Sequence, residues 1–94
     1  MRDINNLIDN LTYSEKYVVE WLIGQLIKSS GYKIKFNTKE SASSVGICES
    51  TVRSAIKKLS IAEVVKYEKE KDLYVVYVTG RTTFHALVKI MGAR

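Results

Sequence analysis

The polar side chains of residues 49–58 are of types that recognise nucleic acids. At helical spacing they share one face, and an apolar stripe occupies the opposite face. Arginine, serine, threonine and glutamate can hydrogen-bond the edges of base pairs, whereas lysine suits backbone phosphates. The helix is predicted from about Glu49 to Leu59 or Ser60. Its candidate DNA-binding residues are Glu49, Ser50, Thr51, Arg53, Ser54, Lys57 and Lys58, and its buried stripe is Val52, Ala55, Ile56 and Leu59.

The residues before this helix have the features of a turn between two steeply crossed helices. Ala42 is small enough for close packing, Gly46 permits a tight turn, and Ile47 is an apolar residue inside that turn. Asn37 and Glu40 have the spacing of a capping box, which predicts that the first of the two helices runs through Val45. Together the two segments predict a helix-turn-helix unit.

Two further places could contact phosphates. The start of the first helix offers Thr38 and Lys39, whose side chains and backbone N–H groups are expected to hold a phosphate. A charged hairpin tip at residues 69–72 offers Lys69 and Lys71. Because acidic residues alternate with these lysines, the tip is nearly neutral.

The elements that position this unit have local signals of their own. Thr12 and Glu15 form a capping box that starts a helix ending near Ser29, which is expected to bury Tyr17, Val18, Trp21, Leu22 and either Gln25 or Leu26. Residues 32–36 alternate apolar and basic side chains, as a strand does. The β-branched and aromatic runs 64–68 and 73–78 predict a hairpin. Helix, helix, strand, helix, helix, hairpin, helix is the order of a winged helix-turn-helix, an α+β fold with extra terminal helices.

The terminal segments carry apolar stripes with two alternative interpretations. Either they pack on each other within one chain, or they pair with a second subunit. We favour a homodimer, because helix-turn-helix proteins use two copies to bind two half-sites. The predicted interface residues are Ile4, Leu7, Ile8, Leu11, Phe84, Leu87, Val88 and Met91. The chain is then a single domain, 1–94, with an N-terminal helix at 1–11, a core at 12–80 and a C-terminal helix at 81–94.

Composition limits the other classes of function. The net charge is +5, and the basic excess begins after residue 24, which suits a polyanion-binding surface. Cys48 is the only cysteine, which excludes an intrachain disulfide, and His85 has no second histidine beside it. No nucleophile–base pair, paired carboxylates or glycine-rich phosphate loop stands out. We expect no enzymatic activity, no metal and no cofactor. With no apolar stretch long enough to span a bilayer, we expect a cytoplasmic protein without membrane contact.

The segment VGICESTVRSAIKKL, residues 45–59, resembles the recognition unit of bacterial winged-helix repressors of the GntR family. Over residues 11–90 the chain is similar to the C-terminal DNA-binding domain of the CodY family of GTP-sensing pleiotropic repressors, from the LTYSE start to the hairpin at Tyr74. The resemblance implies a DNA-binding transcription factor and carries no effector site with it. Glu63 stands where the resemblance places glycine, so a left-handed backbone is expected there.

These observations predict a transcriptional regulator, acting as a repressor, that binds double-stranded DNA as a homodimer through the helix 49–60. Two alternatives remain. One is a winged-helix module that docks on proteins, which predicts apolar exposure on residues 49–58. The other is a DNA-binding domain of a replication, plasmid or phage protein.

Overall fold

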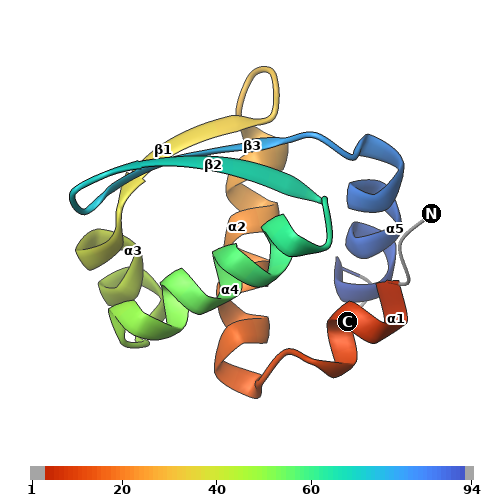
Figure 1. Ribbon diagram of the computed structural model, residues 1–94, viewed down its shortest axis with the longest axis horizontal. Helices are drawn as coiled ribbons and strands as arrows, with labels where there is room; N and C mark the ends of the chain where they lie inside the picture. Colours follow the sequence, from red (N-terminus) through yellow and green to blue (C-terminus); the bar gives the residue numbers. More distant parts are fainter. Residues whose placement is uncertain (1–3, 93–94) are drawn as a thin grey trace.

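The computed structural model describes residues 4–92, which form five helices and one three-stranded sheet (Figure 1). The elements are α1 (Ile4–Asp9), α2 (Tyr13–Lys28), β1 (Lys33–Asn37), α3 (Thr38–Val45), α4 (Glu49–Ile61), β2 (Val65–Glu70), β3 (Leu73–Val78) and α5 (Arg81–Gly92). This is the α+β order predicted from the sequence. The parts of the predicted terminal helices at residues 1–3 and 93–94 lie outside the described residues.

The sheet is antiparallel throughout and has the order β1-β3-β2. Phe36 pairs with Tyr74, and Tyr67 pairs with Val76, so their side chains share the face that packs on the helices. The rings of Phe36 and Tyr74 stack with centroids 6.0 Å apart. Lys33 and Lys35 are exposed on the opposite face, as the alternating pattern predicts. One end of the molecule holds α3 and the β2–β3 turn, and the other end holds α1 and α5 (Figure 1).

The hairpin turn is shorter than predicted. β2 continues to Glu70, which leaves only residues 71–72 between the strands in place of a four-residue tip. Lys71 has a φ of 58°, the left-handed conformation that tight hairpins require. We name the β2–β3 hairpin the wing.

Helices α2 and α3 each begin directly after the capping residue predicted from the sequence. Thr12 and Glu15 form both halves of the predicted capping box. Asn37 caps α3 by accepting a hydrogen bond from the Lys39 N–H at 2.7 Å. Among the described residues Glu40 does not complete the predicted box, so this cap is made by Asn37 alone.

The buried stripe of α2 is rotated from its predicted position. Val18, Leu22 and Leu26 are buried as expected, but Val19 and Ile23 complete the stripe. Tyr17 is 56% exposed, so its prediction as a core residue is wrong. Trp21 packs edge-on against Phe36 of β1, with their ring centroids 5.3 Å apart, and its side chain is half-buried.

The terminal helices pack on each other within one chain, α1 beside α5 (Figure 1). Six of the eight predicted dimer-interface residues are buried here: Ile4, Leu7, Leu11, Phe84, Leu87 and Met91. Ile8 and Val88 are half-buried. A domain this small needs every apolar stripe to complete its core. The intrachain alternative is therefore correct for the six, which are not available to a second subunit in this conformation.

Two left-handed residues set the path of the chain around α4. Gly46 has a φ of 79° and ends α3, and both its N–H and that of Ile47 donate to the Ala42 carbonyl, at 2.8 and 3.0 Å. Glu63 has a φ of 63° after α4, as expected from the resemblance. The helix-turn-helix turn and the entry to the wing therefore both depend on a left-handed residue.

Replacing glycine by alanine is expected to have opposite effects at two positions. An added Cβ meets no atom within 4 Å at Gly46 or Gly24, so the backbone alone decides. Gly46→Ala is expected to lower the free energy of unfolding by about 1 kcal/mol, because alanine is strained at positive φ. Gly24→Ala, inside α2, is expected to raise it by up to about 1 kcal/mol. Urea denaturation followed by Trp21 fluorescence measures both, and equal effects would contradict the assignment of the turn.

Candidate nucleic-acid interface

Helix α4 divides into three rows of side chains. Its predicted stripe is buried under α2 and the sheet, namely Val52, Ala55, Ile56 and Leu59. The row facing solvent consists of Ser50, Arg53 and Lys57 and, at the last position of the helix, Ile61, all of them exposed. Between these rows, Thr51, Ser54 and Lys58 are half-buried. The face that sequence periodicity assigned to DNA is therefore narrower than predicted.

Cys48 occupies the N-cap of α4 without capping it. Its backbone has the extended conformation of a cap residue, but its side chain makes no cap hydrogen bond. The exposed thiol instead lies 3.3 Å from the Ser50 hydroxyl and 3.1 Å from the Thr51 hydroxyl. Hydrogen bonds from Ser50, from Thr51 and from the Thr51 N–H lower the pKa of Cys48 to about 7. At neutral pH a fraction of this thiol is therefore thiolate. The thiolate charge lies at the N-terminal end of α4, next to Glu49.

Glu49 joins the start of α3 to α4. The Thr38 hydroxyl donates to Glu49 Oε1 at 3.0 Å, and Arg53 Nη1 lies 3.9 Å from the same oxygen. This ion pair is loose, and the Arg53 side chain, which is 42% exposed, remains accessible.

Most of the predicted phosphate clamp at the start of α3 is wrong, and only the Lys39 side chain remains available. Thr38 is fully buried, and its N–H donates to the Asp72 carbonyl at 3.0 Å. The Lys39 N–H is taken by the Asn37 cap. Neither backbone donor is free, because the wing turn and the cap satisfy them. Only the exposed Lys39 side chain can reach a phosphate from this position.

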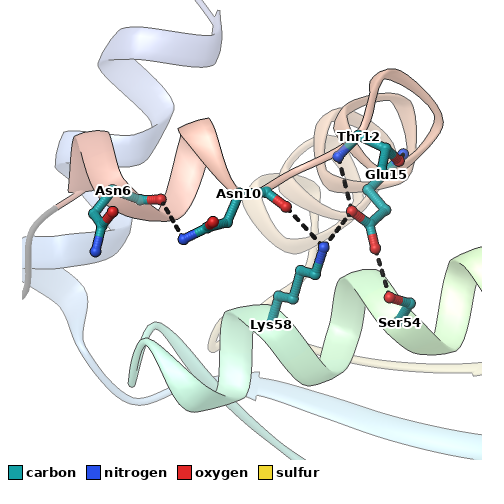
Figure 2. Close-up of polar contacts among 6 residues, drawn as sticks. All are labelled: Asn6, Asn10, Thr12, Glu15, Ser54 and Lys58. Carbon is teal, nitrogen blue, oxygen red and sulfur yellow. Dashed lines mark hydrogen bonds and ion pairs between the residues drawn. The ribbon is translucent and has the colours of Figure 1, made fainter.

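Ser54 and Lys58 turn toward the protein. Figure 2 shows both side chains pointing at Glu15 across the gap between α4 and the start of α2. The Ser54 hydroxyl donates to Glu15 Oε2 at 2.5 Å, and Lys58 Nζ donates to Glu15 Oε1 at 2.7 Å. Lys58 Nζ also donates to the Asn10 carbonyl at 2.7 Å. These contacts within the chain were not predicted from the sequence.

The carboxylate of Glu15 is buried and has several donors. Burial by itself raises the pKa of a carboxyl group, but the hydrogen bonds from Lys58, Ser54 and the Thr12 N–H outweigh it and lower the pKa of Glu15 to about 2. Sequence reasoning assigned Glu15 only to its capping box. Nothing local indicates its second role, because its partners on α4 lie 39 and 43 residues away.

The wing presents Lys69 and Lys71 to solvent, beside the exposed Glu70 and Asp72. Lys69 Nζ lies 5.8 Å from the centre of the Tyr74 ring. The Asp72 carbonyl accepts from Thr38, which places the wing turn beside the start of α3. The wing tip is therefore close to neutral, as predicted, and lies at the same end of the molecule as α3 (Figure 1).

Within residues 4–92, no three His, Cys, Asp or Glu side chains gather as the ligands of a metal ion would. No helix in the same range is long and apolar enough to cross a membrane.

No family model and no curated protein matches the sequence, but solved structures match its fold. One is the homodimeric winged helix-turn-helix DNA-binding domain of Mb0332 from Mycobacterium bovis, a possible ArsR-family transcriptional regulator. Its TM-score is 0.62 with 10% identity, over 96% of this chain and 73% of that one. The fold is a winged helix.

Two other solved structures match with TM-scores of 0.55. AbsC, a MarR family transcriptional regulator from Streptomyces coelicolor, is 14% identical over 94% of this chain and 68% of that one. RV1404 from Mycobacterium tuberculosis is 16% identical, and the match spans 96% of this chain but only 56% of that one. At these identities the likeness concerns the fold alone. The resemblance to GntR and CodY repressors stays a prediction.

The depressed pKa of Glu15 predicts a specific loss of stability in acid. A carboxylate whose pKa is lower in the folded state contributes stability above pH 4.5 that is lost as pH falls toward 2. The free energy of unfolding of the natural chain is therefore expected to fall by roughly 2–3 kcal/mol more than that of Glu15→Gln over this range. Urea titrations of both proteins between pH 6 and pH 2 measure the difference. Parallel curves would contradict the buried carboxylate.

Proposed function

We propose that this winged helix is a transcriptional regulator that binds duplex DNA, with α4 in the major groove. The observation that carries the proposal is the outward row of α4, where Ser50, Arg53 and Lys57 are exposed while the apolar stripe of the same helix is buried. A helix exposed in this way can enter a groove about 12 Å wide without exposing its core.

The proposed roles follow from the position of each side chain. Ser50 and Arg53, near the N-terminal end, would contact base edges together with Thr51 and Glu49, since arginine pairs with guanine and a carboxylate accepts from cytosine. Lys57 would contact a phosphate, and Lys39, Lys69 and Lys71 would contact the flanking backbone. Ser54 and Lys58 are committed to Glu15 and are left out of the proposed DNA-contacting set.

The matched proteins support a regulatory role, because Mb0332 and AbsC are described as transcriptional regulators of the ArsR and MarR families. We propose repression as the direction of control, since a protein that occupies a duplex site excludes other proteins from it. A DNA-binding domain of a replication, plasmid or phage protein would use the same surface of α4.

The protein-docking alternative has less support. It predicts apolar exposure on residues 49–58, whereas the exposed side chains there are serine, arginine and lysine. Of the large exposed apolar residues, only Ile61 belongs to α4, at its last position.

Removing two charges from α4 is expected to weaken DNA binding in a salt-dependent way. Each lost phosphate contact lowers the slope of log K against log salt by about 0.9. In fluorescence anisotropy with mixed-sequence duplex DNA, Arg53→Ala/Lys57→Ala is therefore expected to flatten the slope by about one unit, for the phosphate contact of Lys57, and to weaken binding further because the base contact of Arg53 is lost.

Lys33→Ala/Lys35→Ala removes the same charge from the outer face of the sheet and is the matched control. It should change the slope much less. Absence of binding by the natural chain at low salt would contradict the proposed function, and equal slopes for the two variants would contradict the role of α4.

We also propose that the protein forms a homodimer through the outer surface of its terminal helices. Mb0332 is described as homodimeric. After the intrachain packing, Ile90 of α5 remains exposed, and Ile8 and Val88 are half-buried. This surface lies at the opposite end of the molecule from the wing tip, so a dimer would leave α3 and the wing accessible (Figure 1).

Ile90→Lys is expected to raise the dimer dissociation constant about tenfold or more, because it places a charge in an apolar interface. Ile27→Lys, at an exposed isoleucine near the end of α2, is the control and should have no effect on assembly. Light scattering on a sizing column measures the mass against the 10.7 kDa chain. A natural chain that remains monomeric, or equal effects of the two variants, would contradict this interface.

A further inference from the structure

We propose that Glu15 is the positioning residue of the DNA-binding helix: it fixes where α4 lies against the α1–α2 corner, and it holds Lys58 away from DNA. The inference rests on the proposed function and deepens it, because it separates the residues of α4 that contact DNA from those that hold α4 in place.

The first observation is the number of elements that meet at one carboxylate (Figure 2). Oε1 accepts from Lys58 Nζ and from the Thr12 N–H, at 2.7 and 2.8 Å, and Oε2 accepts from the Ser54 hydroxyl. Lys58 Nζ then continues to the Asn10 carbonyl at the end of α1. The start of α2, the end of α1 and the middle of α4 are therefore joined through two side chains.

The second observation is burial. Among the described residues, Glu15 is the only charged residue in the buried class, and its side chain is 5% exposed. Hydrophobic contacts between α2 and α4 hold the two helices together but are non-directional. Hydrogen bonds to a buried carboxylate are directional and strong, and they define one arrangement.

The third observation is the contrast between two neighbouring lysines. Lys57 is exposed in the outward row of α4, whereas Lys58 already donates to two acceptors. Moving Lys58 to a phosphate would leave the buried Glu15 carboxylate without its counter-charge, which is strongly unfavourable. Lys58 therefore belongs to the scaffold, and Lys57 to the interface.

The test compares Lys58→Met with Lys57→Met, which remove the same charge one residue apart. In anisotropy titrations with a mixed-sequence duplex, Lys57→Met should lower the salt slope by about 0.9. Lys58→Met should leave the slope unchanged and weaken binding about fivefold at every salt concentration, because α4 is no longer fixed. Glu15→Gln should behave as Lys58→Met does.

The opposite pattern would overturn the proposal. If Lys58 contacts phosphate, Lys58→Met lowers the salt slope as Lys57→Met does, and Glu15→Gln binds more tightly because it releases Lys58. Unchanged affinity in a folded Lys58→Met or Glu15→Gln protein also refutes it.

Amide hydrogen exchange tests the positioning role without DNA, so it distinguishes failure of this inference from failure of the proposed function. In Glu15→Gln, protection of the amides of residues 54–59 should fall about tenfold more than protection in β3. A uniform fall across both elements would show that Glu15 contributes only to global stability, and the proposal would then be wrong. The double variant Glu15→Gln/Lys58→Met removes both charges and should recover stability without recovering protection in α4.

Discussion

A buried carboxylate must be supplied with hydrogen-bond donors, and the arrangement of this domain follows from how Glu15 obtains them. One donor is the backbone of its own capping box, and two come from α4. The residue that completes the capping box of α2 is thus also the residue to which α4 is hydrogen-bonded. Removing one hydrogen-bond partner would leave the buried carboxylate unsatisfied, and this penalty is larger than the net stability that the hydrogen bond contributes. The start of α2 and the middle of α4 therefore keep a fixed relative position.

A second polar connection runs from the wing to the outward row of α4. The Asp72 carbonyl accepts from Thr38 N–H, the Thr38 hydroxyl donates to Glu49, and Glu49 lies beside Arg53. Thr38 therefore connects the wing turn to the proposed DNA interface from a buried position. Its burial explains why a residue predicted to touch phosphate instead links the wing turn to the first turn of α4.

Sequence reasoning succeeded where the determining interactions are local. The Thr12–Glu15 box, the left-handed Gly46 and the alternation along β1 each depend on residues within one turn or strand, so the element order followed. It failed where distant segments decide. Tyr17 fits a helical stripe, but the buried stripe of α2 runs through Val19 and Ile23 and leaves Tyr17 exposed. The apolar terminal stripes gave no indication of whether their partner was the same chain. The partners of Glu15 on α4 could not be predicted from the sequence either, because a charge pair separated by more than forty residues leaves no periodic pattern.

The three rows of α4 also bear on how such a domain can diverge. Ser50, Arg53 and Lys57 are exposed and lie outside the buried stripe of α4, so mutation can alter them with little effect on the core. Ser54 and Lys58 are bound to Glu15, so a substitution at either position removes a donor from a buried carboxylate. Under the proposed function, target preference and structural integrity would therefore lie on separate sides of one helix. If the proposed interface is correct, a lineage could acquire new DNA target sites by changing the first set while it inherits the second unchanged.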